Sequence, residues 1–257
     1  MLDGLFKAAA AASSQRAVST SESDLLRQIE LAEAVVDVYD ALAPADHMKI
    51  ISEIKRRSPS RGFLAEIPDA AAQAKIYESA GAHAISVLTE ESGFGGSLAD
   101  LAAARRAVSI PLLRKDFISS EYQILEARAS GADFVLLILS WLEESDYRRL
   151  YDFATDLGLG VLVETHSVEE IEIANNSPAR LIGINTRDLN TFKTDIGLYE
   201  QMSLKLRADA IRVAESSVKT VEDVRRYRDA GADVVLVGEA LVTADPSALI
   251  PEFTSVS

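Results

Sequence analysis

One pattern occurs three times along the chain, at intervals of 50 and 100 residues: a helical stretch ends on Gly-Ala, and an apolar run follows within a few residues. It reads SAGAHAISVLTE around Gly81, ASGADFVLLILS around Gly131 and DAGADVVLVGEA around Gly231. Glycine supplies the left-handed residue that ends a helix, after which a strand can begin. Each interval of about fifty residues has room for two helix–strand units, so the repeat predicts further strands between those it marks.

The apolar segments of the chain supply those strands. We predict eight, at residues 48–54, 84–88, 111–114, 133–139, 160–164, 181–184, 211–214 and 234–237. Helical patterns lie between them at 69–79, 97–107, 120–129, 143–157, 168–175 and 221–228. Strands that alternate with helices indicate a parallel sheet covered on its outer side. About eight units in roughly 250 residues match a (β/α)8 barrel. The alternative is an open doubly wound sheet, but no G-x-G-x-x-G follows the first strand. We therefore predict an α/β fold, a single (β/α)8 TIM barrel.

The chain has no linker-like stretch, so we expect one domain over residues 1–257. Residues 48–257 would form the barrel, and residues 1–47 an N-terminal helical extension packed on it, with one mouth of the barrel as a place that it could cover. Within the extension, residues 21–42 begin with serines suited to cap a helix and carry an apolar stripe. The alanine run at 8–12 is too short and too weakly hydrophobic for a secretory signal or a membrane span.

Composition excludes several classes of function. The chain has no cysteine, which rules out disulfides and thiolate catalysis. Its three histidines, His47, His83 and His166, have no ligand spacing, so we predict no metal site. With 26 basic and 40 acidic residues the net charge is −14, which argues against binding nucleic acid. We expect a cytoplasmic protein without membrane contact, in which any anionic ligand meets a local positive charge.

The segment EIKRRSPSRG ends the first predicted strand with charges. Side chains alternate between the faces of a strand, so Ile51, Glu53 and Lys55 share one side. Burying opposite charges together is costly and is weak evidence of a stabilising device. Glu53 and Lys55 therefore have two possible roles, a chemical one and that of a structural ion pair. In barrels of this kind the chemistry lies at the C-terminal ends of the strands.

Other predicted strands end in the same way. Polar residues share a face with the residue two positions earlier in four cases: Leu113 with Lys115, Leu162 with Glu164, Gly183 with Asn185, and Val213 with Glu215. If the earlier residue of each pair fills the barrel, the later one points into its mouth. Two lysines, three glutamates and an asparagine close together suit proton transfer, and solvated rim residues are the alternative. Four other acids, Glu90, Glu91, Asp116 and Asp188, are interpreted as loop carboxylates or helix caps.

The last two units suggest an anion site. Gly238 ends the eighth predicted strand just before a helix start, EALV. Backbone N–H groups at a helix start bind anions, and the loops after strands seven and eight often hold phosphate in this fold. Ser216, Ser217 and Gly238 would line the site, although Gly238 could simply make a tight turn.

Several motifs, in order, resemble the signatures of the indole-3-glycerol phosphate synthase family: EIKRRSPSRG, SVLTE with FGGS after it, PLLRKDFI, VLVET, IGINTRDLNTF, VAES and VGEALV. They span residues 49–242 or so. Related phosphate-binding barrels of tryptophan and histidine synthesis share the last two loops but not EIKRRSPS with LLRKDFI. The resemblance implies a phosphorylated substrate, 1-(o-carboxyphenylamino)-1-deoxyribulose 5-phosphate, and no metal or organic cofactor. It implies ring closure and loss of CO₂ and water to give indole-3-glycerol phosphate.

The resemblance also implies roles for single residues. Lys115 looks like the acid that protonates the substrate ketone, and Glu164 like the group that assists loss of the hydroxyl. Glu53 and Asn185 would orient that hydroxyl and the lysine, with a share in proton transfer also open to Glu53. Lys55 would contact the substrate carboxylate or phosphate, and an acid role for it stays open. The remaining expected contacts are substrate positioning by Glu215 and Ser216, phosphate binding by Ser58, Arg187, Ser217, Gly238 and Glu239, and an anthranilate wall of Phe94, Phe117 and Leu136. We expect a monomer, at most loosely associated with other enzymes of the pathway.

Two positions depart from the family pattern. Ser217 stands where the family has glycine, and Thr186 where it often has asparagine. If residue 217 has a positive φ, serine costs on the order of 1–2 kcal/mol of strain there, and we expect weakened or altered phosphate binding. Two other functions are considered. A related barrel isomerase would use an Asp or Cys acid–base pair, and a catalytically silent scaffold would have no need of Lys115.

Overall fold

The computed structural model describes residues 2–187 and 194–257. Its centre is a closed barrel of eight parallel strands in the order β1-β10-β9-β8-β7-β6-β5-β4. These strands are β1 (Lys49–Ile54), β4 (Ala84–Leu88), β5 (Leu112–Lys115), β6 (Phe134–Ile138), β7 (Gly160–Thr165), β8 (Leu181–Asn185), β9 (Ile211–Glu215) and β10 (Val234–Val237). All eight predicted strands are confirmed, and closure of the sheet excludes the open doubly wound alternative.

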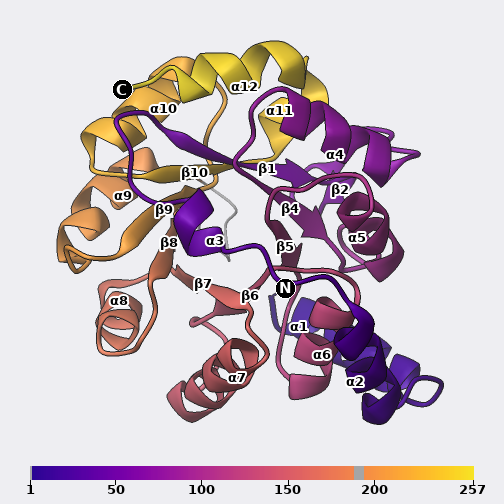
Figure 1. Ribbon diagram of the computed structural model, residues 1–257. Helices are drawn as coiled ribbons and strands as arrows, with labels where there is room; N and C mark the ends of the chain where they lie inside the picture. The colour runs from indigo at the N-terminus through magenta and orange to yellow at the C-terminus, as the bar shows by residue number, and fades with distance from the viewer. Residues whose placement is uncertain (1, 188–193) are drawn as a thin grey trace.

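Helices surround the barrel (Figure 1). Six correspond to predicted helices: α4 (Ala70–Ser79), α5 (Leu98–Arg105), α6 (Glu121–Ala129), α7 (Glu144–Asp156), α8 (Val168–Asn175) and α10 (Val221–Asp229). The helix start predicted at EALV is confirmed as α11 (Glu239–Thr243). Not predicted were α9 (Ile196–Met202) with the 3₁₀ turn η1 (Ser203–Lys205), α12 (Pro246–Thr254), and a hairpin of β2 (Arg57–Ser58) and β3 (Gly62–Phe63). The glycine repeat marks helix ends as predicted: Gly81, Gly131 and Gly231 have left-handed φ values of 95°, 88° and 87°.

Strand alternation divides the core into two layers. One set of side chains, which includes Ile51, Leu113, Leu162 and Val213, fills the barrel interior and is fully buried. The other set packs outward against the helices, as Val163 on β7 does. Because the period of a strand is two residues, the position after each interior residue faces outward and the next returns to the barrel axis. This register aims the polar strand ends into one mouth.

The extension is helical, as predicted, but it forms three helices: α1 (Leu2–Ala17), α2 (Glu22–Leu31) and α3 (Val38–Ala41). The expected helix over residues 21–42 is interrupted, because residues 33–37 are not helical and Asp37 caps α3 instead. Figure 1 shows α2 beside α6. Val38 packs so tightly on the first residue of β7 that a Cβ on Gly160 would lie 2.4 Å from its Cγ1. Helix α3 therefore covers the N-terminal end of the barrel. In the described part of the chain, no helix has the length and apolar character to span a membrane.

Candidate active site

A cavity of about 580 Å³ opens at the C-terminal end of the barrel. All fifteen residues named from the sequence line it: Glu53, Lys55, Ser58, Phe94, Lys115, Phe117, Leu136, Glu164, Asn185, Arg187, Glu215, Ser216, Ser217, Gly238 and Glu239. The structure thus brings together every candidate that strand parity and the motifs selected. Asp188, interpreted as a loop carboxylate or cap, lies outside the described residues.

Lys115 lies at the centre of the polar cluster. Its Nζ is 3.1 Å from Glu215 Oε2, 3.8 Å from Glu164 Oε2 and 4.0 Å from Glu53 Oε1. Its side chain is 17% exposed, whereas the three carboxylates are nearly inaccessible. Burial would lower the pKa of Lys115, but the charges of the three glutamates outweigh it and raise that pKa above its ordinary value. The lysine therefore carries its proton at neutral pH.

The charge pair that ends the first strand is also part of this cluster. Lys55 Nζ lies 2.5 Å from Glu53 Oε2. Burial would raise the pKa of Glu53, but Lys55 and Lys115 lower it, so the group is a carboxylate. Gly238 leaves room for the pair, because a Cβ there would lie 2.2 Å from Glu53 Oε2 and 2.9 Å from Lys55 Nζ. The glycine thus has a steric role beside the charged groups.

The two glutamates nearest Lys115 differ in protonation. Burial would raise the pKa of Glu164, but His166, Lys115 and the amide of Asn185 lower it to about 2. Asn185 donates from Nδ2 to Glu164 Oε1 at 3.1 Å. Burial and the neighbouring Glu164 instead raise the pKa of Glu215 to about 8, against the opposing effect of Lys115. Of the two, Glu164 is therefore the stronger acid, and Glu215 is the one that binds a proton more readily.

The loop after β9 is strained. Ser216 and Ser217 have φ of 70° and 68°, a left-handed conformation unfavourable to residues other than glycine. Hydroxyl contacts hold both residues in place: Ser216 Oγ donates to Asn185 Oδ1 at 2.8 Å, and Ser217 Oγ lies 2.8 Å from Thr186 Oγ1. Tyr227 OH donates to the Ser216 carbonyl at 3.1 Å. Ser217 therefore meets the condition for backbone strain, a positive φ, and the two residues that depart from the family pattern contact each other.

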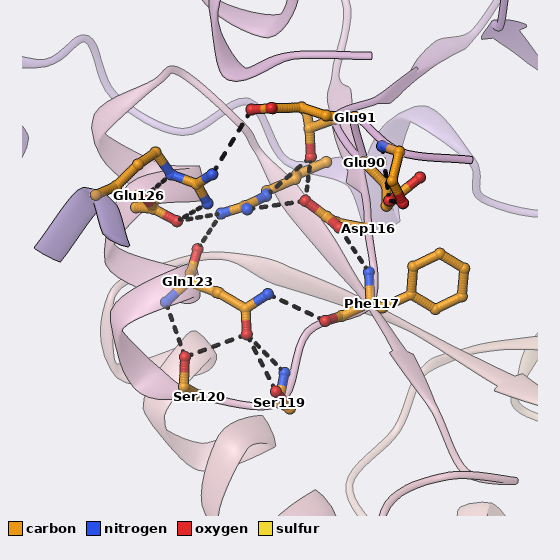
Figure 2. Close-up of polar contacts among 12 residues, drawn as sticks. Glu90, Glu91, Asp116, Phe117, Ser119, Ser120, Gln123 and Glu126 are labelled. Atoms are coloured by element: carbon orange, nitrogen blue, oxygen red, sulfur yellow. Dashed lines mark hydrogen bonds and ion pairs between the residues drawn. The ribbon is translucent and has the colours of Figure 1, made fainter. Parts of the chain in front are cut away.

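A buried network supports the strand end that carries Lys115. Arg114 is fully buried; its Nη2 lies 2.9 Å from Asp116 Oδ2 and its Nη1 3.4 Å from Glu126 Oε2. Asp116 Oδ1 accepts from the Phe117 N–H at 2.8 Å, and Gln123 Nε2 donates to the Phe117 carbonyl at 3.0 Å (Figure 2). Both the N–H and the carbonyl of Phe117, two residues after Lys115, are therefore fixed by hydrogen bonds.

Two of the acids that were expected to be loop carboxylates or helix caps, Asp116 and Glu90, make specific buried contacts. Asp116 is not a helix cap but the partner of Arg114. Glu90 is buried and accepts from the backbone N–H groups of Ser92, Gly93 and Phe94, which braces the loop that carries Phe94. Glu91 is exposed, as expected, and lies 3.9 Å from Arg16.

The apolar side of the cavity includes a residue of the extension, which was expected to pack on the barrel but was not assigned to the site. Phe94 and Phe117 have ring centroids 6.1 Å apart, and Leu136 is buried beneath them on β6. Leu5 of α1 also lines the cavity. Its neighbour Phe6 packs edge-on against Phe117 at 5.1 Å. Nothing in the alanine-rich sequence of α1 indicates this docking.

The mouth is also bridged by an ion pair. Arg61, in the loop of the β2–β3 hairpin, lies 2.9 Å from Glu239 at the start of α11. Both residues line the cavity. Within residues 2–187 and 194–257, the structure groups no three His, Asp or Glu side chains in a way that could hold a metal ion. The polar cluster is thus built from ammonium, carboxyl and amide groups.

Fold and cavity together define a (β/α)8-barrel protein with buried acid and base groups at the C-terminal mouth. A family model described as indole-3-glycerol phosphate synthase matches residues 2–253. An indole-3-glycerol phosphate synthase of Leifsonia xyli is 57% identical over 84% of this chain and 84% of its own length. One from Mycolicibacterium vanbaalenii is 45% identical over 99% and 94%. The chain belongs to the indole-3-glycerol phosphate synthase family.

A solved structure shares the fold at a greater distance. A thiamine phosphate pyrophosphorylase from Pyrococcus furiosus superposes with a TM-score of 0.61 at 14% identity, over 81% of this chain and 95% of the other. At that identity the likeness concerns the barrel alone.

Proposed function

We propose that this barrel converts 1-(o-carboxyphenylamino)-1-deoxyribulose 5-phosphate into indole-3-glycerol phosphate, CO₂ and water. Family membership makes the chain a carboxy-lyase of tryptophan biosynthesis. The observation that carries the site assignment is a single ammonium, Lys115, held within 4.0 Å of three buried glutamates at the base of the cavity. The relatives are named as synthases, so the comparisons favour neither an isomerase nor a silent scaffold.

In the first step, Lys115 gives a proton to the ketone oxygen of the substrate. The aromatic carbon that carries the carboxylate then attacks the ketone carbon, which closes the five-membered ring. The carboxylate leaves as CO₂, and its bonding electrons restore the aromatic ring. The raised pKa of Lys115 keeps this donor protonated, and Glu53 and Glu215 hold the ammonium in place.

The second step removes the hydroxyl formed from the ketone. Water leaves with a proton from Lys55, or from Lys115 after solvent has reprotonated it, while the ring nitrogen supplies electrons. Ionised Glu164 stabilises the positive charge that develops on the nitrogen and accepts the proton of the adjacent carbon, which completes the indole. Asn185, 3.1 Å from Glu164 Oε1, orients that carboxylate, and Glu53 orients the leaving hydroxyl.

Substrate binding uses the remaining lining residues. Phosphate would lie against Ser58, Arg187, Ser217 and the Gly238–Glu239 backbone, and Lys55 would contact the substrate carboxylate. Phe94, Phe117 and Leu136 would enclose the anthranilate ring, with Glu215 and Ser216 as positioning groups. Local cations of this kind are needed because the chain as a whole carries a charge of −14.

The same proposal extends to organisation and location. We place residues 1–257 in one functional domain, with residues 1–47 as an extension of a barrel formed by 48–257. Leu5 in the cavity wall and Val38 against the other end of the barrel support this unit. We also propose a cytoplasmic monomer that associates at most loosely with other enzymes of the pathway.

The test of the proposed function is product identification. The purified protein is incubated with the carboxyphenylamino-deoxyribulose phosphate, and the product is analysed by mass spectrometry with parallel CO₂ measurement. We expect indole-3-glycerol phosphate and CO₂ in equal amounts. An aminoketose isomer with its carboxylate retained would contradict the proposal, and so would unchanged substrate with folded protein.

Gly238→Ala is expected to lower kcat by about 10²-fold, because displacing a reacting group by about 1 Å can cost that much. The new methyl group would collide with Glu53 and Lys55. The backbone of Gly238 has a negative φ, so alanine should not prevent folding. Gly4→Ala is the matched control, since a Cβ there meets nothing within 4 Å. Equal kcat in both variants would argue against the steric role of Gly238.

Ser217→Gly is expected to lower the KM for the phosphorylated substrate. Glycine adopts the left-handed φ of 68° without strain, which frees the loop to fit the phosphate. The gain is limited to about tenfold, since strain of about 1.4 kcal/mol corresponds to that factor. Steady-state KM for the variant and its parent measures the effect, and identical values within error would sink the idea.

A further inference from the structure

His166 contacts the site from the end of β7. Its Nε2 lies 3.2 Å from Glu164 Oε1, and its Nδ1 lies 3.7 Å from Glu170 Oε2 on α8. The His166 backbone N–H donates to the same Glu170 carboxylate at 2.7 Å. The side chain of His166 is 12% exposed, and among the described residues neither ring nitrogen has a partner in hydrogen-bond geometry. The ring therefore interacts with its surroundings mainly as a charge between two carboxylates.

Three buried glutamates share two ammoniums in this cavity, so the placement of each cation decides which of the glutamates are ionised. Glu53, Glu164 and Glu215 are each at most 4% exposed in their side chains. Two ammoniums lie among them: Lys55 is paired with Glu53, and Lys115 is closer to Glu215 than to Glu164. A buried carboxylate without a full partner is costly. Within the described chain, His166 is the one further cationic side chain in ion-pair range of Glu164.

We propose that His166 is a positioning residue. As an imidazolium between Glu164 and Glu170, it keeps Glu164 ionised, so that a proton bound by the Glu164–Glu215 pair lies on Glu215. Without that imidazolium, the nearer ammonium of Lys115 would favour ionisation of Glu215, at 3.1 Å, over Glu164, at 3.8 Å. His166 thus selects which of two buried glutamates beside Lys115 is the base.

The electrostatics agree with this geometry. Burial would lower the pKa of His166, but the carboxylates of Glu164 and Glu170 raise it to about 10. The groups that face Glu164 from the packed elements are His166 directly after its own strand, Lys115 on β5, Asn185 on β8 and Glu215 on β9, with Glu53 beyond Lys115 on β1. Since the folded pKa of His166 is raised, its stabilising contribution is complete below about pH 6.5. That contribution is lost as the pH rises through about 10.

The role of Glu164 as proton acceptor rests on the proposed function, but its charge state does not. The first experiment therefore needs no turnover: the imidazole ¹⁵N resonances are followed by NMR from about pH 5 to pH 10. The chain has three histidines, and His83 has a pKa lowered to about 4 by burial and by nearby Lys49 and His47. We expect the His166 ring to remain protonated above pH 8, and Glu170→Gln to lower its midpoint by at least about one pH unit. A neutral His166 at pH 7 in the parent protein would overturn the proposal.

The second experiment tests the consequence for catalysis. In His166→Gln, the acid limb of kcat/KM should move to higher pH by at least about one unit, because that limb reports the base of the free enzyme. A lost structural contact would lower activity equally at all pH values. His47→Gln, on an exposed side chain, is the control. Parallel profiles for His166→Gln and its parent would overturn the proposal, whereas inactivity of the parent protein would contradict only the proposed function.

Discussion

Lys115→Ala is expected to lower kcat by about 10²- to 10⁴-fold, the range that a positioned general acid contributes. The substitution removes the ammonium from the centre of the cluster, 3.1 Å from Glu215 and 3.8 Å from Glu164. It also leaves three buried glutamates with Lys55 as their remaining ammonium partner within the described residues, so their pKa values should rise. Protonation of Glu164 would then weaken the second step as well as the first.

The KM for the substrate should change less than kcat, because the lysine acts on the ketone and not on the expected phosphate site. Steady-state kinetics, together with circular dichroism to establish folding, measure both quantities. Lys75→Ala is the matched control, since Lys75 is exposed on α4 and remote from the cavity lining. A folded Lys115→Ala protein with kcat close to that of its parent would remove Lys115 from the acid role.

Asp116→Ala is expected to destabilise the barrel by about 3–5 kcal/mol, the cost of leaving a buried charge without its partner. Asp116 is 5% exposed and lies 2.9 Å from the fully buried guanidinium of Arg114. Glu126, at 3.4 Å, is a more distant carboxylate for the same cation and is shared with Arg16. The Phe117 N–H also loses its acceptor, so the aromatic wall should loosen.

Denaturant unfolding gives the change in free energy. Glu91→Ala is the control: its side chain is 66% exposed and 3.9 Å from Arg16, so we expect a change within about 0.5 kcal/mol. A double variant, Arg114→Met with Asp116→Ala, should recover part of the loss, since it removes the unpaired charge. A loss below about 1 kcal/mol for Asp116→Ala alone would contradict the role of the network.

The strand ends could be predicted from sequence because the period of a strand is rigid. Glu53, Lys115 and Glu164 each follow an interior apolar residue by two positions, and a closed barrel must bring such residues to one mouth. The predicted strands agreed with the observed ones to within a residue for the same reason. The glycine repeat added the helix ends, because a left-handed residue has few alternatives to Gly.

Contacts between distant segments could not be predicted in this way. Leu5 reaches the cavity because α1 packs on the barrel through Phe6. The alanine-rich sequence of this helix does not indicate which residues it contacts. Thr186 and Ser217 were noted separately, yet they touch across 31 positions of sequence. His166 was considered only as a metal ligand; the available signal was its place two residues after Glu164 and four before Glu170.

Indole fluorescence tests the central claim most directly. The parent protein and Lys115→Ala are mixed in parallel with 1-(o-carboxyphenylamino)-1-deoxyribulose 5-phosphate, and the emission of the forming indole is followed with time. We expect a steady rise for the parent protein and its loss in Lys115→Ala. A flat trace from folded parent protein, or equal rises from both, would contradict it.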